Sequence, residues 1–249
     1  MPSGRRQPFV PIARALRARF ADQSDLEGAL ADHRVLVDGR PVTNPNARVR
    51  RDASIRVLPA RGLRGDRKLA LAFDALAVDA AGVVAVDVGA AAGGFATALR
   101  RAGAWRVYAV DTGYGQLRGS LRVDPRVVDL ERTNVASLGP DLVPDVVDVV
   151  TMDLSYTSIA DAIRPLDGLR LAAGARLVAL VKPTFELAAA TVVLDRARVD
   201  AAIALASKAI EAAGWRCDAI TIPRASGRHG AIEAFVLAIH DPEGGSRPR

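Results

Sequence analysis

The chain has 249 residues, of which 50% are hydrophobic and 25% are charged, a composition typical of a soluble globular protein with one or two domains. Its basic N-terminal residues are followed by no continuous apolar stretch, and no uncharged apolar run approaches the ~20 residues of a spanning helix, so neither a signal peptide nor a membrane anchor is predicted. The single cysteine, Cys217, excludes an internal disulfide and favours a cytoplasmic protein.

The positive charge is unevenly distributed and is almost entirely arginine. Residues 1–67 contain 14 arginines and seven acidic residues, whereas the remainder carries 20 basic and 21 acidic side chains. The net charge of +6 therefore belongs to the N-terminal quarter, which favours a nucleic-acid-binding region over a solvated tail. Only Lys68, Lys182 and Lys208 are lysines. Because lysine can do proton chemistry that arginine cannot, a retained lysine is a candidate functional residue, although Lys208 lies in an Ala-rich helical stretch typical of a solvated surface.

The first 60 residues show the pattern of a small α+β module. Apolar stripes and a Ser-x-x-Glu capping box predict two short helices, and Asp38-Gly39 between apolar runs predicts a hairpin. The helices are expected over 11–20 and 24–32, and the short strands at 35–37, near 42 and at 55–57.

From residue 68 onward, apolar strands alternate with helices. The strands are expected at 83–88, 106–111, 127–130, 146–154, 175–181, 219–223 and 234–239, and the helices at 68–78, 94–102, 114–121, 158–165 and 195–213. This alternation indicates an α/β fold with a mostly parallel, doubly wound sheet. We therefore expect a small domain over 1–60, a linker over 61–67 and an α/β domain over 68–249.

A glycine-rich turn follows the first strand of the α/β domain. Asp87-Val88-Gly89 leads through Gly93-Gly94-Phe95 into a helix, which lets backbone amides approach a ligand closely. The spacing differs from the Gly-x-Gly-x-x-Gly pattern of dinucleotide sites. Asp111 ends the next strand, where a carboxylate can accept hydrogen bonds from ribose hydroxyls. The pair favours S-adenosylmethionine over NAD, and the competing interpretation is a structural turn with a solvated aspartate.

Several further blocks carry a more specific pattern. They are Arg64-Gly65-Asp66-Arg67-Lys68-Leu69, Asp111-Thr112-Gly113-Tyr114-Gly115-Gln116-Leu117, Asp124-Pro125-Arg126-Val127, Glu131-Arg132-Thr133-Asn134, Asp153-Leu154-Ser155, Lys182-Pro183-Thr184-Phe185-Glu186 and Gly230-Ala231-Ile232-Glu233-Ala234-Phe235. In this order they resemble motifs of the TlyA family, whose catalytic half is similar to FtsJ-type RNA ribose methyltransferases. The resemblance spans nearly the whole chain. It implies a Rossmann-like methyltransferase domain that binds S-adenosylmethionine and methylates structured RNA, with ribosomal RNA or ribosomal subunits as partners.

The resemblance also assigns site residues. The family's catalytic Lys-Asp-Lys-Glu tetrad falls on Lys68, Asp153, Lys182 and Glu233. A ribose 2′-hydroxyl is a poor nucleophile that a neighbouring lysine can hold or deprotonate, and the carboxylates can orient the lysines. The competing interpretation is a structural ion-pair network. No metal is expected, because displacement from a sulfonium needs chiefly positioning and deprotonation. The expected cofactor-binding residues are Asp87, Gly89, Gly93, Gly94, Phe95, Asp111, Glu131, Asn134 and Asp153.

The N-terminal module resembles the small RNA-binding domain of the ribosomal-protein-S-four type through residues 35–42 and 52–55. RNA contacts are expected from a set of arginines, namely Arg14, Arg17, Arg19, Arg34, Arg48, Arg50, Arg51 and Arg64. The start of the second helix is acidic where such modules are usually basic.

Two further departures from the family pattern, at 187–190 and at Ala231, keep a second hypothesis open. In it, the chain is a non-catalytic RNA-binding or ribosome-assembly factor on the same fold. A third hypothesis, a membrane-acting pore former, follows from the haemolysin label that some family members carry. The absence of a spanning segment or a long cationic amphipathic helix argues against it.

Overall fold

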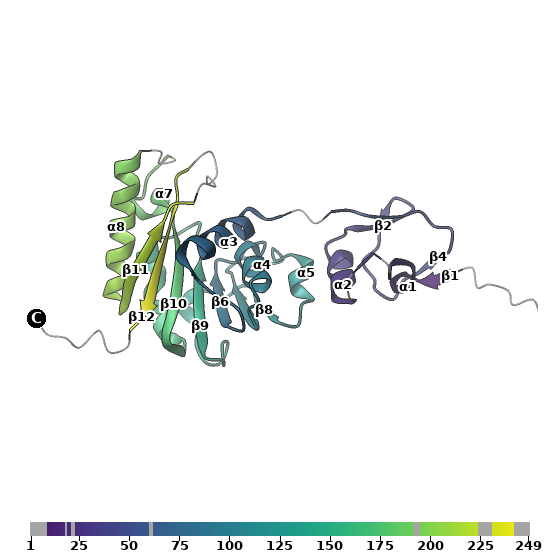
Figure 1. The fold of residues 1–249 in the computed structure, drawn as a ribbon, viewed down its shortest axis with the longest axis horizontal. Coiled ribbons are helices and arrows are strands. Elements are labelled where there is room, and N and C mark those ends of the chain that lie inside the picture. The colour runs from purple at the N-terminus through teal and green to yellow at the C-terminus, as the bar shows by residue number, and fades with distance from the viewer. Residues whose placement is uncertain are drawn as a thin grey trace, which may run out of the picture. The chain divides into compact units, whose positions relative to one another are not determined.

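The computed structural model describes residues 9–17, 19–20, 23–59, 62–191, 195–223 and 231–241. By its internal contacts the chain divides into two compact units: unit 1, residues 1–62 with 118–125, and unit 2, residues 63–117 with 126–249. Their helices and strands are drawn in Figure 1. Residues 118–125, expected in the α/β domain, thus group with unit 1. Of the helix predicted over 114–121, only α5 (Gly119–Arg122) forms.

Unit 1 is built from short elements around a small apolar core. They are β1 (Phe9–Pro11), α1 (Ile12–Leu16), α2 (Gln23–Ala31), β2 (Val35–Val37), β3 (Arg40–Pro41), β4 (Arg48–Arg50) and β5 (Ile55–Val57), besides α5. β1 pairs with β4, and β2 lies between β3 and β5. Ile12, Leu16 and Val35 are fully buried between these elements. The burial of such apolar side chains is the main stabilising contribution to a unit of this size.

The hairpin predicted in unit 1 is present, whereas its first helix is shorter than predicted. Asp38 and Gly39 have φ values of +49° and +79°, as a two-residue hairpin turn requires. α1 ends at Leu16 rather than at residue 20. The Arg19 guanidinium donates a hydrogen bond to the Ile55 carbonyl at 3.0 Å, so the residues after α1 are drawn toward β5 instead of continuing the helix.

Unit 2 is built on a seven-stranded sheet. Its strands are β6 (Val84–Val88), β7 (Arg106–Val110), β8 (Val127–Leu130), β9 (Val147–Met152), β10 (Leu171–Val181), β11 (Trp215–Thr221) and β12 (Ala234–His240). Their order across the sheet is β11-β12-β10-β9-β6-β7-β8, and only β12 runs antiparallel to its neighbours. The predicted mostly parallel, Rossmann-like sheet is therefore confirmed (Figure 1).

Helices cover both faces of this sheet. They are α3 (Arg64–Leu76), α4 (Gly94–Arg101), α6 (Ile159–Ile163), α7 (Pro183–Glu186) and α8 (Arg196–Ala212), with 3₁₀ turns η1 (Val135–Ser137) and η2 (Arg164–Gly168). In β12, Phe235 packs on Phe95 of α4, whereas Val236 belongs to the core cluster that contains residues of α8. Because successive residues of a strand point to opposite faces, α4 and α8 lie on opposite sides of the sheet.

The segment expected to link two domains is partly helical. α3 begins at Arg64, so the last four residues of the predicted linker form its first turn. The Asp66 carboxylate lies in that turn, where the helix dipole favours a negative charge, and it pairs with Arg101 of α4. Across the described ranges, no helix combines the length and the apolar character needed to cross a bilayer.

Candidate active site

The loop after β6 packs against the ends of two neighbouring strands. Gly89 has a φ of +86°, and a Cβ placed there would lie 2.6 Å from the Asp153 carbonyl oxygen. The amides of Gly89 and Ala90 donate to the Val110 carbonyl at 2.9 and 3.0 Å. Only glycine satisfies both the backbone conformation and the close approach, so the loop lies directly over the carboxyl ends of β7 and β9.

Asp111 is held at the end of β7 by two backbone hydrogen bonds. Its Oδ2 accepts from the Ala91 amide at 2.8 Å, and its Oδ1 accepts from the Gly113 amide at 2.7 Å. A carboxylate oxygen has about two acceptor positions, so each oxygen can accept one further donor. The half-buried carboxylate is therefore fixed in orientation and still able to bind a pair of hydroxyl groups.

A cavity of about 320 Å³, here called the glycine cavity, lies at this edge of the sheet. Five of the predicted cofactor-binding residues line it: Gly89, Gly94, Phe95, Asp111 and Asp153. The other four lie outside the lining. Asp87 is fully buried in β6 and Gly93 caps α4, whereas Glu131 accepts from the Gly115 amide at 2.7 Å and Asn134 caps η1.

Several lining residues were missed at the sequence level. They include Leu63, Gly65, residues 90–92, Gln116 and Tyr156. A Cβ on Gly94 would lie 2.9 Å from the Gly65 Cα, so α3 and α4 approach each other through two glycines. The glycine in the Arg64-Gly65 motif was the available signal, because a residue without a side chain at a helix start permits such an approach.

Asp87, in the strand that leads into the glycine-rich loop, has a raised pKa. Burial, together with the smaller effects of the nearby Asp153 and Asp111 charges, raises the pKa of its carboxyl from 3.8 to about 7. The hydrogen bond from the Thr151 hydroxyl, 2.9 Å long, acts in the opposite direction. A substantial fraction of Asp87 is therefore neutral at physiological pH.

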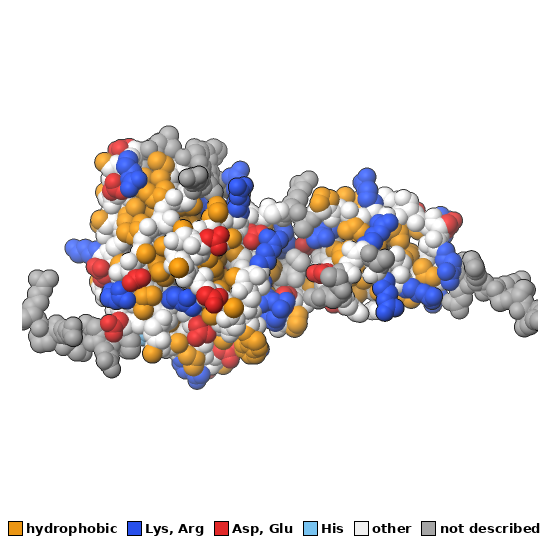
Figure 2. Space-filling model, viewed as in Figure 1, with side chains coloured by type: hydrophobic (Ala, Val, Ile, Leu, Met, Phe, Trp, Pro, Cys, Tyr) orange, Lys and Arg blue, Asp and Glu red, His pale blue; other side chains and the backbone are white. Residues whose placement is uncertain are grey.

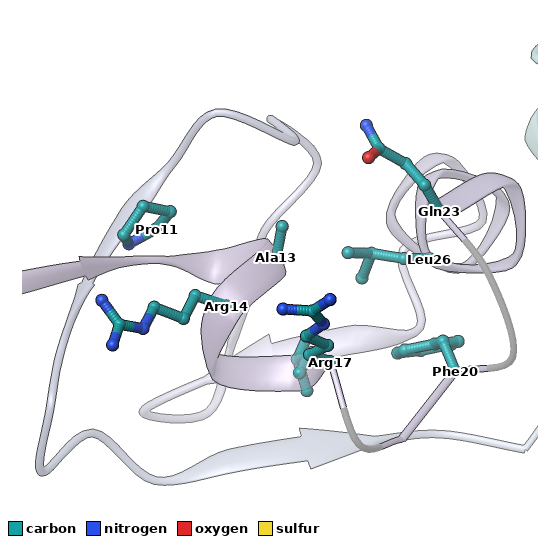
Figure 3. Close-up of a pocket in the computed structure, with 8 residues that line it drawn as sticks. Pro11, Ala13, Arg14, Arg17, Phe20, Gln23 and Leu26 are labelled. Atoms are coloured by element: carbon teal, nitrogen blue, oxygen red, sulfur yellow. The ribbon is translucent and has the colours of Figure 1, made fainter.

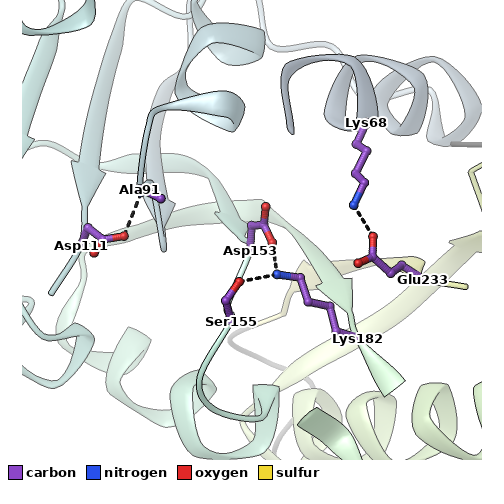
Figure 4. A network of polar contacts seen from close by, with 7 residues as sticks. All are labelled: Lys68, Ala91, Asp111, Asp153, Ser155, Lys182 and Glu233. Carbon is purple, nitrogen blue, oxygen red and sulfur yellow. Dashed lines mark hydrogen bonds and ion pairs between the residues drawn. The ribbon is translucent and has the colours of Figure 1, made fainter. Parts of the chain in front are cut away.

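A second cavity, of about 530 Å³ and here called the lysine cavity, shares part of its wall with the first. Arg64, Gly65, Asp153 and Ser155 line both cavities. The lysine cavity is also lined by Lys68, Lys182 and Glu233, so all four residues of the predicted tetrad meet there. Figure 4 shows them arranged as two lysine–carboxylate pairs.

The first pair joins α3 to the start of β12. Lys68 Nζ donates a hydrogen bond to Glu233 Oε2, and the two residues are only 9% and 8% exposed. A buried charge without a partner costs several kcal/mol, so each member of this pair makes the burial of the other tolerable.

The second pair lies where β9 and β10 end, and it is more exposed. Lys182 Nζ lies 2.6 Å from Asp153 Oδ1, an ion pair whose angle falls outside hydrogen-bond geometry. The same Nζ donates a hydrogen bond to the Ser155 hydroxyl at 2.7 Å. An ammonium has three donors, so one remains for a group that enters the cavity. Ser155 was not among the predicted site residues.

Glu186 connects the segment that follows β10 to the segment that follows β9. Its Oε1 accepts a hydrogen bond at 3.0 Å from the amide of Ile159, the first residue of α6. Burial raises the pKa of the Glu186 carboxyl, against the opposite effect of that amide. The bond connects α7, which follows Lys182, to the helix that follows Ser155.

The arginines predicted to bind RNA have varied partners. Backbone carbonyls accept from three of them: Ile55 from Arg19, Leu58 from Arg34 and Phe9 from Arg48. Arg50 pairs with Asp52 at 3.4 Å, Arg51 is exposed, and Arg14 and Arg17 line a cavity of unit 1 drawn in Figure 3. Figure 2 shows blue side chains spread over the visible face of unit 1 with little acidic surface between them.

Arg64 belongs to unit 2, whereas the other predicted RNA-binding arginines belong to unit 1. It is exposed at the start of α3 and lines both the glycine and the lysine cavity. Within the described part of the chain, no group of three or more His, Cys, Asp or Glu side chains is arranged to hold a metal ion.

Comparisons with known proteins show the family to which the chain belongs. The pattern of the FtsJ-like methyltransferase family matches residues 63–239. The 16S/23S rRNA (cytidine-2′-O)-methyltransferase TlyA of Mycobacterium tuberculosis is 37% identical over 235 residues, which cover 90% of this chain and 86% of the relative. Hemolysin A of Brachyspira hyodysenteriae is 33% identical over 155 residues, 61% of this chain and 64% of that protein.

A solved structure shares the fold over almost the full length. It is a protein of Streptococcus thermophilus that bears the hemolysin name, with a TM-score of 0.68 over 95% of this chain and 90% of that one. Its sequence identity is 23%, so the likeness concerns the fold alone.

Proposed function

Because the chain belongs to the FtsJ-like methyltransferase family, and within it to the TlyA group, we propose that it methylates the ribose 2′-hydroxyl of structured RNA, with S-adenosylmethionine as methyl donor and ribosomal RNA as substrate. One observation carries the proposal. The glycine cavity and the lysine cavity share Asp153 and Ser155, so a cofactor in the first and a ribose in the second would meet at a common wall.

The residues of the glycine cavity fit S-adenosylmethionine. Its volume of about 320 Å³ suits a small ligand, and Gly89 and Gly94 let the surrounding backbone segments pack closely around it. The Asp111 carboxylate retains acceptor positions for two ribose hydroxyls, and Phe95 and Tyr156 offer aromatic surface. When bound, this cofactor supplies a methyl group on a positively charged sulfur.

Lys182 is proposed to hold and deprotonate the reacting hydroxyl. The Ser155 hydroxyl takes up one of its donors and the Asp153 carboxylate pairs with its charge, which leaves a donor for the ribose oxygen. In its neutral form, the same nitrogen accepts the hydroxyl proton as the oxygen becomes methylated. The resulting ammonium is then stabilised by the Asp153 carboxylate.

Lys68 and Glu233 are proposed to fix the opposite wall of the lysine cavity. Their buried ion pair ties the first turns of α3 to the start of β12, and α3 also lines the glycine cavity through Gly65. Positioning of this kind matters because a misplacement of ~1 Å can cost on the order of 100-fold in rate.

Unit 1 is proposed to bind the RNA substrate through its arginines. Their exposed guanidinium groups can pair with phosphates, which supply most of the sequence-independent affinity of RNA-binding proteins. This role follows from the charge of the N-terminal quarter and from its likeness to modules of the ribosomal-protein-S-four type.

The test is methyl transfer from labelled S-adenosylmethionine to purified ribosomal subunits, naked ribosomal RNA and transfer RNA. We expect label in the ribosomal RNA of at least one of these substrates. Absence of label from every RNA, in a preparation that binds the cofactor, would overturn the proposal. The alternative of a non-catalytic assembly factor predicts that absence, together with RNA binding that is unchanged in Lys182→Ala.

A further inference from the structure

Unit 1 contains a cavity of its own, about 640 Å³ in volume, here called the arginine cavity. It is lined by residues of α1, the segment that follows α1, and the first residues of α2 (Figure 3). All of these residues belong to one unit, so the cavity does not depend on how the two units are placed. Its volume is sufficient for a ligand of the size of one nucleotide.

One part of the cavity wall is cationic. Arg14 of α1 and Arg17, which caps the C-terminus of α1, are exposed and three residues apart, so they project from neighbouring positions. Neither forms an ion pair with a carboxylate of the described residues, and no described carboxylate lines the cavity. Glu27, on the same helix as the lining residue Gln23, accepts a hydrogen bond from Gln23 Nε2 at 2.8 Å. The wall is therefore suited to an anion.

The other part of the wall is apolar and includes an aromatic ring. Leu16 and Leu26 are buried in the core of unit 1, and Phe20 is half-buried and packs against it. In Figure 3, Phe20, Leu26 and Arg17 point toward one another across the opening between α1 and α2. A flat apolar group that entered here would contact the ring while an attached anion reached the guanidinium groups.

We propose that the arginine cavity binds one unpaired nucleotide of the RNA. The base lies against Phe20 and Leu26, and its flanking phosphates pair with Arg14 and Arg17. Aromatic rings beside a cationic surface are the usual means of binding single-stranded nucleic acid. A base within a duplex is stacked on both faces and cannot enter. The inference rests on the proposed function only in taking RNA as the ligand.

Binding is measured with the full chain, without cofactor, by fluorescence anisotropy of a short single-stranded RNA and of the same sequence as a duplex. For Arg14→Ala combined with Arg17→Ala, we expect single-strand affinity to fall on the order of tenfold or more. The slope of log affinity against log salt concentration should decrease in magnitude by about 1.4, which is about 0.7 for each lost phosphate contact. Arg40→Ala, an exposed arginine of β3 outside the cavity, is the matched control and should change both values less.

The aromatic contact is tested by Phe20→Leu, which keeps an apolar side chain in the core and removes the ring. We expect about tenfold weaker binding of intact single strands and no further loss with an RNA that carries abasic residues. Circular dichroism of each variant checks the fold.

Three results would overturn the inference. They are equal effects of Phe20→Leu on intact and abasic RNA, duplex binding as tight as single-strand binding, and arginine variants that bind like Arg40→Ala. Displacement of the RNA by an acidic peptide with the same dependence on Phe20 would instead assign the cavity to a protein. Because no cofactor is present, a failure of methyl transfer leaves these binding results interpretable, and the reverse also holds.

Discussion

Half of the residues that line the glycine cavity are glycine, alanine or serine, whereas the lining of the lysine cavity includes two lysine–carboxylate pairs. The first can select a ligand by shape and by the fixed carboxylate of Asp111. The second offers charges that can hold and move a proton. Because Asp153 and Ser155 line both cavities, a substitution that alters one cavity can also alter the other. Under the proposed function, cofactor binding and proton transfer are therefore divided between neighbouring loops at one edge of the sheet.

The largest effect is expected from breaking the buried pair of the lysine cavity. Lys68→Met leaves Glu233 charged and unpaired, so the free energy of unfolding should fall by about 3–5 kcal/mol. Combined with Glu233→Leu, the substitution should regain most of that stability but no activity. Urea denaturation and a methyl-transfer assay measure the two quantities. A single variant as stable as the wild type would show that the pair is not buried as described.

A substitution that changes the shape of the glycine cavity should have an effect nearly as large. In Gly89→Ala the new Cβ meets the Asp153 carbonyl and the residue is strained at φ +86°, so we expect a loss of about 3 kcal/mol in stability or in cofactor binding. Gly214→Ala is the matched control, because its φ is +81° and nothing lies within 4 Å of its Cβ. It should show only the conformational cost of about 1–2 kcal/mol. Equal losses in both variants would contradict the close approach of the loop to β9.

The partly buried pair of the lysine cavity, Lys182 and Asp153, is tested without a change of charge. Lys182→Arg keeps a cation but cannot accept a proton, and its bulk displaces the hydroxyl, so methyl transfer should fall on the order of 100-fold or more. Cofactor affinity, measured by calorimetry, should be unchanged. Lys208→Arg on the exposed surface of α8 should be silent, within about 0.5 kcal/mol in stability. Wild-type turnover of Lys182→Arg would remove this lysine from the chemistry.

Substitution of Asp87 should have the smallest of these effects, and it should change how the stability depends on pH. Because the pKa of its carboxyl is raised from 3.8 to about 7 in the folded protein, the folded state binds more protons than the unfolded state between these values. This residue therefore lowers the stability as the pH rises from 5 to 8, by about 2–3 kcal/mol. Asp87→Asn should remove that dependence in urea denaturation, whereas Asp74→Asn on the exposed surface of α3 should keep it. A pH profile unchanged in Asp87→Asn would contradict the assignment.

The sheet was predictable from the sequence because its strands are long and apolar enough to alternate visibly with helices. The glycine-rich loop and Asp111 were predictable for the same reason, since each follows a strand directly. The position of β12 between β10 and β11 was not, because it depends on pairing between segments far apart in the chain. β1 and β4 are three residues each and show no periodicity, so their pairing also escaped prediction.

The residues of the lysine cavity were also predictable only in part. Lys68, Asp153, Lys182 and Glu233 were singled out by resemblance, and the structure brings them to one cavity. Which lysine pairs with which carboxylate could not be read from the sequence, because it depends on where α3 and β12 meet. Ser155 was missed as a partner of Lys182 for a similar reason, since nothing local distinguishes a serine that accepts a hydrogen bond from a solvated one.

The central claim is that the lysine cavity acts on a ribose hydroxyl, and the position of the transferred methyl group tests it most directly. Ribosomal RNA labelled by the wild-type protein is hydrolysed in alkali, which cleaves next to every free 2′-hydroxyl. We expect label in alkali-resistant dinucleotides, because a methylated 2′-oxygen cannot attack the neighbouring phosphate. Label that appears only in alkali-released mononucleotides, with the methyl group on a base, would contradict it.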